Sequence, residues 1–439
     1  MFLPETVLSC IRILEQSGFS AYAVGGCVRD ALLGLTPHDY DLCTNATPTE
    51  IAELFAAYPL VRSGEKHGTI GVVMDGQVLE ITTFRTEGGY QDGRHPDWVR
   101  FVPNLREDLS RRDFTVNAMA YNPTDGYQDP FGGQDDLQRG ILRTVGDPGQ
   151  RFSEDALRIL RGVRFAVRFH LTPDPDTLQA MKALSPTMDK LARERVFDEL
   201  CKLLPLVTAK DLMDYAPILA QVVPVLSPCL GFLQHSPHHL YDVYEHTAHV
   251  VEAAPKELSV RWAALLHDCG KPACFQKDAQ GIGHFYGHAQ ESTRLAEEML
   301  TQLKAPKALR ERVCFLIAHH MNPLEPDKRL LRRWLGKFGE AAMWELLALQ
   351  EADVSATVHS TQRFAQIRQL FQEILSEEAC LTLKNLQVSG SDLLLAGFAP
   401  GPQMGDCLQW LLQQVQDELL PNEKQALLTA AQEFLRSTL

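Results

Sequence analysis

Apolar residues recur at helical spacing through most of the chain. Near the N-terminus, Val7, Leu8, Ile11 and Leu14 fall on one side of a helix, with charged residues between them. The pattern therefore predicts a mostly helical chain that begins with an amphipathic helix. The same period predicts long helices over residues 155–169, 260–267, 290–303 and 308–320.

One segment departs from the helical period. Residues 68–85, GTIGVVMDGQVLEITTFR, hold mostly β-branched apolar residues on both sides of Asp75-Gly76. Asp-Gly is a strong signal for a two-residue hairpin turn. The segment predicts a β-hairpin, so residues 1–145 mix strands with helices. Further along, residues 226–239, with two prolines, and residues near 377–385 predict breaks between helical parts.

Composition narrows the class of protein. A chain of 439 residues allows two or more domains with buried cores, and 45% hydrophobic residues are typical of globular proteins. No apolar run approaches the ~18 residues of a membrane span. Charged residues within the first helix argue against a signal peptide. The ten cysteines form no CxxC pair, which indicates reduced thiols in a cytoplasmic protein.

The net charge of −14 argues at first sight against a nucleic-acid partner. Residues 139–168 differ from the rest of the chain, because seven arginines there face only Asp147, Glu154 and Asp155, a surplus of four. We therefore expect a basic surface within an acidic chain.

Three acids in the first 145 residues predict a metal site. Asp39 and Asp41 are two residues apart in HDYDLCT, so on a strand both point to one face, about 6–7 Å apart. Glu80 lies on the second strand of the predicted hairpin. Converging carboxylates need a cation between them, and hard oxygen ligands select Mg²⁺. The alternative is a strand edge with solvated acids.

A glycine pair precedes these acids and favours the metal site. Gly25-Gly26 in YAVGGCVRD would let backbone N–H groups approach a phosphate closely. Arg29 adds a fixed positive charge beside them. Two Mg²⁺ ions next to such an element could activate a hydroxyl and stabilise a leaving pyrophosphate.

These motifs resemble, in order, those of the class II tRNA nucleotidyltransferases, the CCA-adding enzymes. That family is related to bacterial poly(A) polymerases within the polymerase-β-like superfamily. The matching blocks over about residues 20–205 are GGCVRDALLG, HDYDLCT, EITTFR, RRDFTVNAMA, DPFGGQDDL and EDALRILRGVRFA, and VSGSDLLLAGFAPGPQMG follows near the C-terminus. The resemblance implies an α+β protein with a polymerase-β-like head of mixed sheet and helices (1–145), a helical neck (146–205), a helical body (206–378) and a tRNA-binding helical tail (379–439).

The resemblance also implies an activity and its residues. The reaction would add C, C and A to the 3′ end of tRNA from CTP and ATP, with Mg²⁺ and without a nucleic-acid template. The implied catalytic and metal-binding acids are Asp39, Asp41 and Glu80. The implied nucleotide-binding residues of the head are Gly26, Arg29, Arg112, Asp113 and Asn117.

The block EDALRILRGVR carries a candidate for base selection. On a helix, Asp155 and Arg158 are neighbours, and Arg161 and Arg164 follow at the same interval. A carboxylate acceptor beside a guanidinium donor matches the pairing edges of cytosine and adenine. Guanine and uracil would leave buried polar groups unpaired, at ~1–3 kcal/mol each. In the family this motif reads the incoming nucleotide, which would make Asp155 and Arg158 the template; an ordinary salt-bridged helix face is the alternative.

Residues 85–101 resemble the flexible loop of the family. Gly88, Gly89, Gly93 and Pro96 suit a mobile element. A loop of this form favours full CCA addition over CC addition alone, and an ordinary surface loop is the alternative.

The middle of the chain holds a second set of candidate metal ligands. Adjacent His267-Asp268 ends an apolar helix, and more histidines follow on later helices, as in a metal-ligand array on a helical bundle. The set resembles the HD-domain phosphohydrolases, which implies a divalent transition metal such as Ni²⁺ or Mn²⁺ and hydrolysis of 2′,3′-cyclic phosphates or 2′-phosphates. The candidates are His246 (or His249 in its place), His267, Asp268, His288, His319, His320 and Asp353. Scattered histidines without a metal are the alternative.

Other functions stay open at this stage. A bacterial poly(A) polymerase usually has a long basic tail, whereas from Leu206 onward this chain has 20 basic and 27 acidic residues. An enzyme that adds only A is a further possibility. A catalytically idle tRNA-binding or HD signalling protein is a third, and the intact acids argue against it. No obligate protein partner is evident.

Overall fold

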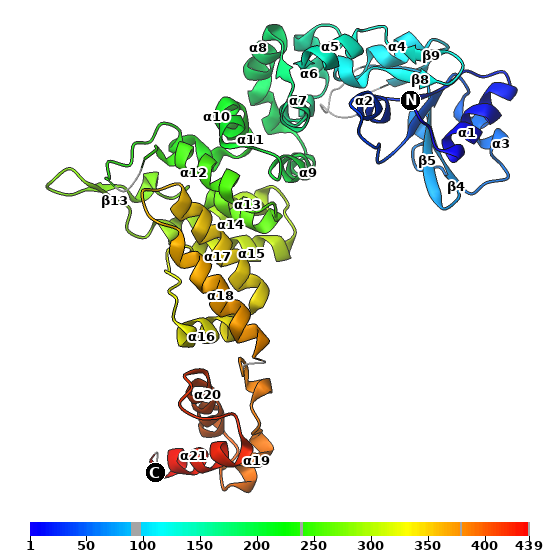
Figure 1. Cartoon of the computed structure of the whole chain (residues 1–439). Helices are drawn as coiled ribbons and strands as arrows, with labels where there is room; N and C mark the ends of the chain where they lie inside the picture. The colour runs from blue at the N-terminus through cyan, green and yellow to red at the C-terminus, as the bar shows by residue number, and fades with distance from the viewer. Residues whose placement is uncertain (89–97, 238–239, 378–379, 438–439) are drawn as a thin grey trace. The chain divides into compact units, whose positions relative to one another are not determined.

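The computed structural model describes residues 1–88, 98–237, 240–377 and 380–437 of the chain. The chain divides into two compact units. The first comprises residues 1–206 and 215–224, and the second comprises residues 207–214 and 225–439. A sheet with helices in the first unit and helices in the second confirm the α+β class (Figure 1). The finer division into head, neck, body and tail stays a prediction.

A seven-stranded mixed sheet lies at the centre of the first unit. All neighbouring strands in it run antiparallel except β5 and β2, which run parallel. In spatial order the strands are β3 (Leu60–Val61), β4 (Thr69–Met74), β5 (Gln77–Thr83), β2 (Asp41–Thr44), β1 (Ala21–Val24), β8 (Ala120–Asn122) and β9 (Gly126–Gln128).

The predicted hairpin is confirmed as β4 and β5. Asp75 and Gly76 form its turn with φ values of 49° and 78°, the positive angles that tight hairpin turns require. Along β5 burial alternates, so Glu80 is exposed between buried Leu79 and Ile81. The parallel register pairs Glu80 with Asp41 on β2. Directly paired residues point to the same face, so these two acids lie side by side.

Helices cover the sheet and continue the first unit. The predicted N-terminal helix is confirmed as α1 (Glu5–Gln16), which buries Val7, Ile11 and Leu14. The other helices of this unit are α2 (Gly26–Leu32), α3 (Pro48–Leu54), α4 (Leu105–Ser110), α5 (Gly133–Arg139), α6 (Pro148–Glu154), α7 (Leu157–Phe169), α8 (Pro175–Leu184), α9 (Arg193–Leu203) and α11 (Ala216–Val222). Two short strand pairs add β6 (Arg85–Gly88) with β7 (Trp98–Phe101), and β10 (Ile141–Leu142) with β11 (Thr172–Pro173).

The helix predicted from residue 155 begins two residues later. Asp155 has extended backbone angles, φ −145° and ψ 103°, and separates α6 from α7. Its carboxylate accepts the backbone N–H of Leu157 at 3.0 Å. Aspartates that bond to nearby backbone in this way compete with helix formation. The prediction that Asp155 and Arg158 share one helix is therefore wrong.

The second unit is built of helices. Those predicted over 260–267, 290–303 and 308–320 are confirmed, each within about two residues. In chain order the helices are α10 (Ala209–Asp214), α12 (Val243–Ala253), α13 (Leu258–Leu266), α14 (His288–Gln302), α15 (Lys307–His319), α16 (Lys328–Phe338), α17 (Glu340–Ser355), α18 (Gln362–Ser376), α19 (Gly390–Leu395), α20 (Pro402–Gln416) and α21 (Lys424–Ser437). A short hairpin, β12 (Gln276–Lys277) and β13 (Gly283–His284), interrupts them between α13 and α14.

The second unit has a bundle and a C-terminal group with its own core. Helices α12, α13, α15 and α17 pack against one another in the bundle (Figure 1). In the C-terminal group, α19–α21 bury Leu393, Leu411 and Leu427 together. Part of each predicted break lies outside the described residues. Among the described residues, no helix combines the length and the apolar character that a membrane span requires.

Candidate active site and a second metal-ligand cluster

A cavity of about 480 Å³ lies in the first unit. The start of α2, the first residue of β2, residues 111–117 and α7 form its walls. Eight arginines and four acids line it, so the cavity has the positive excess that attracts a polyanion. Ten of the predicted site residues line this one cavity: Gly26, Arg29, Asp41, Arg112, Asp113, Asn117, Asp155, Arg158, Arg161 and Arg164.

Asp41 is the first residue of β2 and lies near two other acids. Partial burial is the largest influence on its pKa and raises it; Arg112 opposes this, and Glu80 and Asp39 raise it further. Asp39 comes before β2 and not within it, with an exposed carboxylate 3.0 Å from His38 Nδ1. The prediction that both aspartates project from one strand is therefore wrong, although their charges still interact. Three repelling carboxylates offer the hard oxygen ligands that suit Mg²⁺.

The glycine turn before α2 disfavours a side chain at Gly25, through its positive φ and through the nearby Arg112. Gly25 has φ 78°, and a Cβ there would lie 2.9 Å from Nη1 of Arg112. On α2, buried Arg29 donates a hydrogen bond to Asn117 Oδ1 and lies 4.2 Å from the ring centre of Phe169. Burial lowers the pKa of Arg29, and the adjacent Asp30 carboxylate opposes that shift. These contacts fix the guanidinium in the cavity wall.

Asp113 is the buried centre of a polar network. Its carboxylate accepts two hydrogen bonds from Arg161, at 2.9 and 2.7 Å, and one from Asn117 Nδ2 at 3.1 Å. Burial alone would raise its pKa, but Arg161 and these hydrogen bonds outweigh burial and lower the pKa to about 2. Asp113 is thus a fixed negative charge that holds Arg161 at the cavity.

The two residues predicted to read the base are each held by another partner. Asp155 pairs with Arg195 of α9 at 2.8 Å. Arg158 pairs with Glu154 at 2.6 Å and also donates to the carbonyl oxygen of Arg111 at 3.2 Å. Both line the same cavity, so the structure brings them together as predicted, and they do not form the ion pair with each other that the alternative of a salt-bridged helix face implied.

Sequence reasoning missed a buried acid behind the cavity. Asp108 on α4 is fully buried and lies 2.9 Å from Arg111 and 3.4 Å from Arg112. Its Oδ1 also accepts the backbone N–H of Arg85 at 3.2 Å. The available signal was spacing, because an acid three and four residues before two arginines pairs with both on a helix. Arg195 was also missed, and it carried no comparable signal.

The seven arginines of residues 139–168 do not form one basic surface. Four of them, on α7, line the cavity. The other three pair with nearby acids: Arg139 with Asp135, Arg143 with Asp136, and Arg151 with Glu154. Three of the α7 arginines are paired as well, Arg158 with Glu154, Arg161 with Asp113 and Arg164 with Glu199, so the segment contributes a basic wall to the cavity and not one free basic surface.

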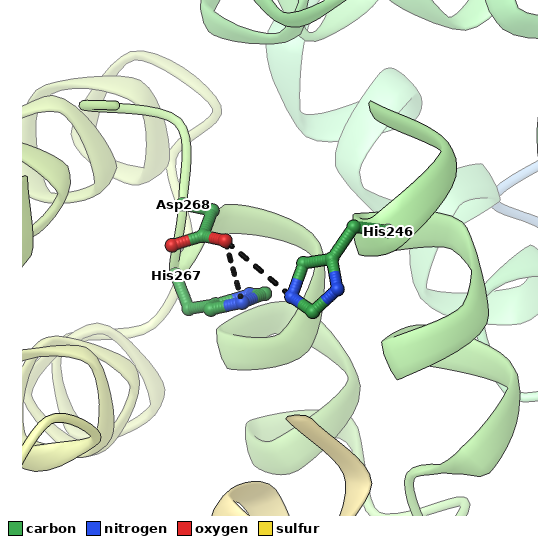
Figure 2. Close-up of side chains that lie close together, drawn as sticks. All are labelled: His246, His267 and Asp268. Atoms are coloured by element: carbon green, nitrogen blue, oxygen red, sulfur yellow. Dashed lines mark ion pairs between the residues drawn. The ribbon is translucent and has the colours of Figure 1, made fainter. Parts of the chain in front are cut away.

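A buried cluster of histidines and aspartates lies in the second unit. Figure 2 shows one carboxylate oxygen of Asp268 in ion pairs with both His267, which follows α13, and His246 of α12. Asp268 Oδ2 lies 3.2 Å from His267 Nε2 and 3.5 Å from His246 Nε2, while Asp353 Oδ1 of α17 lies 3.0 Å from His246 Nε2. The other carboxylate oxygen of Asp268 is 3.4 Å from His288 Nε2.

The histidine tautomers point lone pairs into this cluster. Nδ1 of His267, His288 and His320 lies 2.9, 2.8 and 2.6 Å from the carbonyl oxygen three residues earlier, so Nδ1–H donates there. In the neutral rings of His288 and His320, Nε2 is then a bare acceptor, yet these two atoms are 3.3 Å apart. Burial lowers the pKa of His320 to about 4, which disfavours a proton between them. Burial would lower the pKa of His267, but the carboxylate of Asp268 outweighs burial and raises it. Neutral imidazoles held by carbonyls, together with carboxylates, fit a transition metal.

Two predicted histidines lie outside the cluster. His319 Nδ1 is 2.9 Å from Asn322 Nδ2, and its ring packs against Trp334 and Phe338, so its assignment as a ligand is wrong. His249 stacks on Tyr241, which leaves His246 as the member from α12.

One further residue of the cluster was missed. Lys271 Nζ lies 2.7 Å from Asp268 Oδ2 and 2.8 Å from Gln234 Oε1. Its signal was the sequence HDCGK, where the lysine follows the aspartate by three residues.

Comparisons with known proteins agree with this geometry. Family models match at residues 21–143 (poly A polymerase head domain), 170–230 (probable RNA and SrmB-binding site of polymerase A) and 274–431 (putative tRNA nucleotidyltransferase domain 2). Fold and cavity together define a nucleotidyltransferase.

Curated relatives and solved structures show which family of nucleotidyltransferases the chain belongs to. The chain is 36% identical to a CCA-adding enzyme of Levilactobacillus brevis, over 97% of each chain, and 32% identical to one of Streptococcus gordonii, again over 97% of each. The Bacillus stearothermophilus CCA-adding enzyme in complex with CTP superposes with a TM-score of 0.72 at 28% identity, over 100% of this chain and 99% of that one. The chain belongs to the family of CCA-adding enzymes. A Thermotoga maritima CCA-adding enzyme complexed with tRNA, at 20% identity and a TM-score of 0.62 over 100% and 97% of the two chains, shares the fold.

Proposed function

We propose that this chain adds C, C and A to the 3′ end of tRNA from CTP and ATP. The observation that carries the proposal is the register of β2 and β5, which sets Asp41 beside Glu80 at a cavity rich in arginine. Asp39, Asp41 and Glu80 would hold Mg²⁺. When bound, the metal would polarise the attacking 3′-hydroxyl and neutralise the leaving pyrophosphate.

The protein itself positions the nucleotide. Arg29 and Arg112 line the cavity near Asp41 and would bind the triphosphate through charge-assisted hydrogen bonds. Asp155 would accept a hydrogen bond from the amino group of cytosine or adenine, and Arg158 would donate a hydrogen bond to the adjacent ring nitrogen. An incoming base would replace part of the contacts that these two residues make with Arg195 and Glu154.

A nucleotide-addition assay tests this function. Purified protein, Mg²⁺ and a tRNA that ends at the discriminator base are incubated with CTP, with ATP and with both. We expect two additions from CTP alone and three from the mixture. Long A tails would instead identify a poly(A) polymerase, and addition of A only to a tRNA that already ends in CC would identify an A-adding specialist.

A substitution tests the assignment of the acids. Asp41→Asn should remove nearly all nucleotide addition and leave tRNA binding intact, because the carboxylate acts on the transition state. Asp75→Asn is the matched control, since it changes an exposed acid in the turn that precedes β5. An Asp41→Asn variant that keeps more than a few per cent of the rate would contradict the assignment.

The buried cluster of the second unit favours a second activity, metal-dependent phosphohydrolysis. Asp268 directs Oδ2 toward His246 and His267 and Oδ1 toward His288, so the site suits one or two ions such as Ni²⁺ or Mn²⁺. When bound, the metal would activate a water for attack on a phosphate ester. The proposed substrates are 2′,3′-cyclic phosphates and 2′-phosphates.

Metal content and hydrolysis test the second activity separately. Elemental analysis of purified protein should find a bound transition metal that His267→Ala/Asp268→Ala loses. The wild type supplied with Ni²⁺ or Mn²⁺ should hydrolyse 2′,3′-cyclic AMP, and the double variant should not. A wild type that binds no metal and hydrolyses none of these esters would leave the cluster structural.

A further inference from the structure

The cavity beside the histidine–aspartate cluster has two unlike walls. It has a volume of about 500 Å³, within the range that small-molecule sites occupy. One wall is the cluster itself, with Asp268, His288 and Asp353. The other wall is residues 283–287, which comprise β13 and the turn that leads to α14, and it is aromatic.

A pair of parallel rings, exposed Tyr286 and half-buried His284, lies on this second wall. Tyr286 is 72% exposed, although a ring of this size is usually buried when it has only a packing role. The imidazole of His284 lies parallel to it, with 5.4 Å between ring centres and 7° between planes. An exposed aromatic ring supported by a second, parallel ring is a surface on which a nucleic-acid base can stack.

The aromatic wall is held rigidly before any ligand arrives. Asp278 accepts the backbone N–H of Ile282 at 2.9 Å and lies 2.8 Å from His284 Nε2, so it fixes both the turn and the ring. Gly283 donates its N–H to the carbonyl of His235 at 2.8 Å, and a Cβ on Gly283 would lie 2.2 Å from the carbonyl oxygen of Gln234. A surface fixed in advance loses little conformational entropy when a ligand binds.

The wall and the cluster are also joined along the chain. Tyr286 is two residues before His288, the first residue of α14. Lys271 links the two as well, since its ammonium contacts Asp268 and lies 5.3 Å from the ring centre of Phe285. A phosphate at the cluster would therefore have its organic portion beside Tyr286.

We infer that Tyr286 and His284 form a base-stacking subsite, so the cluster acts on nucleoside phosphates and not on small phosphate esters in general. The inference rests on the proposed phosphohydrolase activity for its reaction, and on the aromatic wall for its substrate class. The nucleoside phosphate could be a free nucleotide or the last nucleotide of an RNA.

Kinetics with matched substrates test the subsite. The substrates are 2′,3′-cyclic AMP, a short RNA that ends in a 2′,3′-cyclic phosphate, and glycerol 1,2-cyclic phosphate, which has no base. Base stacking is worth ~1–3 kcal/mol, so Tyr286→Ala should raise KM for the first two by about five- to a hundredfold, with kcat changed little. The KM for the glycerol ester should not change, and Tyr286→Phe should behave as the wild type.

Two controls keep the outcomes separate. Phe2→Ala removes an exposed ring from the first unit and should alter no KM, and circular dichroism reports that each variant is folded. A Tyr286→Ala variant with equal losses on base-containing and base-free esters, or with an unchanged KM for both 2′,3′-cyclic AMP and the RNA, would overturn the subsite. An effect on the RNA alone would assign the subsite to RNA ends.

If the wild type hydrolyses none of the three esters, the phosphohydrolase proposal fails. A measurement of ligand binding then tests whether the base-stacking subsite exists. Calorimetric titration of the metal-loaded protein with 3′-AMP and with glycerol phosphate then compares the two ligands. Tighter binding of 3′-AMP that Tyr286→Ala removes would support the subsite, and equal affinities would refute it.

Discussion

Asp108 shows how one buried carboxylate can organise a binding surface that it does not line. It holds Arg111 and Arg112 at the cavity and ties them to the backbone of β6 at Arg85. Burial raises its pKa, but the two arginines outweigh burial and lower it, so Asp108 stays charged. Replacement of Asp108 should therefore weaken nucleotide binding.

We predict that Asp108→Asn raises KM for CTP and ATP by roughly ten- to a hundredfold. Hydrogen bonds to charged groups are worth ~1.5–3 kcal/mol, and the amide can still accept the N–H of Arg85. Steady-state kinetics measure the effect, with Glu107→Gln on the same helix as the control. A lower melting temperature with unchanged KM would show that Asp108 only stabilises the fold.

The ion pair of Asp113 with Arg161 predicts a pH dependence of stability. The pKa of Asp113 is lowered to about 2 in the folded chain, below the ordinary value of 3.8. The stabilisation is therefore complete above pH 4 and is lost as the pH falls toward 2. The difference corresponds to stabilisation on the order of 2 kcal/mol. Urea unfolding of wild type and Asp113→Asn should give a gap that is constant between pH 7 and 5 and smaller at pH 3. A gap that grows in acid would contradict the sign.

At the scale of elements, α16 joins the bundle to the C-terminal helices. Arg332 pairs with Glu377 at 2.9 Å and also with Glu418, and Arg333 pairs with Asp417. Further basic residues face a neighbouring cavity of about 630 Å³ that lies between α16, residues 381–384 and α20. Two of these are Lys337 and Lys384, both exposed.

We predict that Lys337→Glu/Lys384→Glu weakens tRNA binding and leaves KM for CTP unchanged, because these lysines would contact the phosphates of the RNA. Each lost phosphate contact should reduce the slope of log affinity against log salt by about 0.7–0.9. Filter binding over a range of salt concentrations measures the slope, with Lys256→Glu as the control for charge alone. An unchanged slope would exclude the two lysines from the tRNA surface.

Local elements could be predicted from the sequence, whereas long-range partners could not. The hairpin followed from β-branched residues around Asp75-Gly76, since a tight turn depends on its own residues. The parallel pairing of β2 with β5 joins strands distant in sequence, and no local pattern specifies it. The break at Asp155 was missed because an aspartate that bonds to the backbone N–H two residues later does not disturb the apolar period.

For the adjacent residues His319 and His320, spacing along the helix could have decided which one belongs to the cluster. His320 is seven residues after buried Val313, so both lie on one face of the helix, whereas His319 is turned away. The cluster itself was predicted because its residues are chemically distinctive. The acids that pair with the arginines of the first cavity were not predicted, because many acids of the chain could have been their partners.

At the scale of the whole molecule, the two proposed sites lie in different units. We predict that Asp41→Asn abolishes CCA addition and leaves cyclic phosphate hydrolysis unchanged, while His267→Ala/Asp268→Ala does the reverse. One matrix of both proteins in both assays measures this, with Mg²⁺, Mn²⁺ or Ni²⁺ supplied. Loss of both activities in either variant, with an intact fold by circular dichroism, would show that the sites are coupled.

The division into units has a consequence for any attempt to obtain half of this protein. The chain leaves the first unit after residue 206, returns to it for residues 215–224, and then leaves again. Truncation at residue 206 removes α11, which packs against residues 185–190 and α8 of the first unit. Truncation at residue 224 retains α10, whose partner α12 belongs to the second unit. Neither unit is one continuous stretch of the gene, so a single premature stop codon or proteolytic cut cannot release an intact unit.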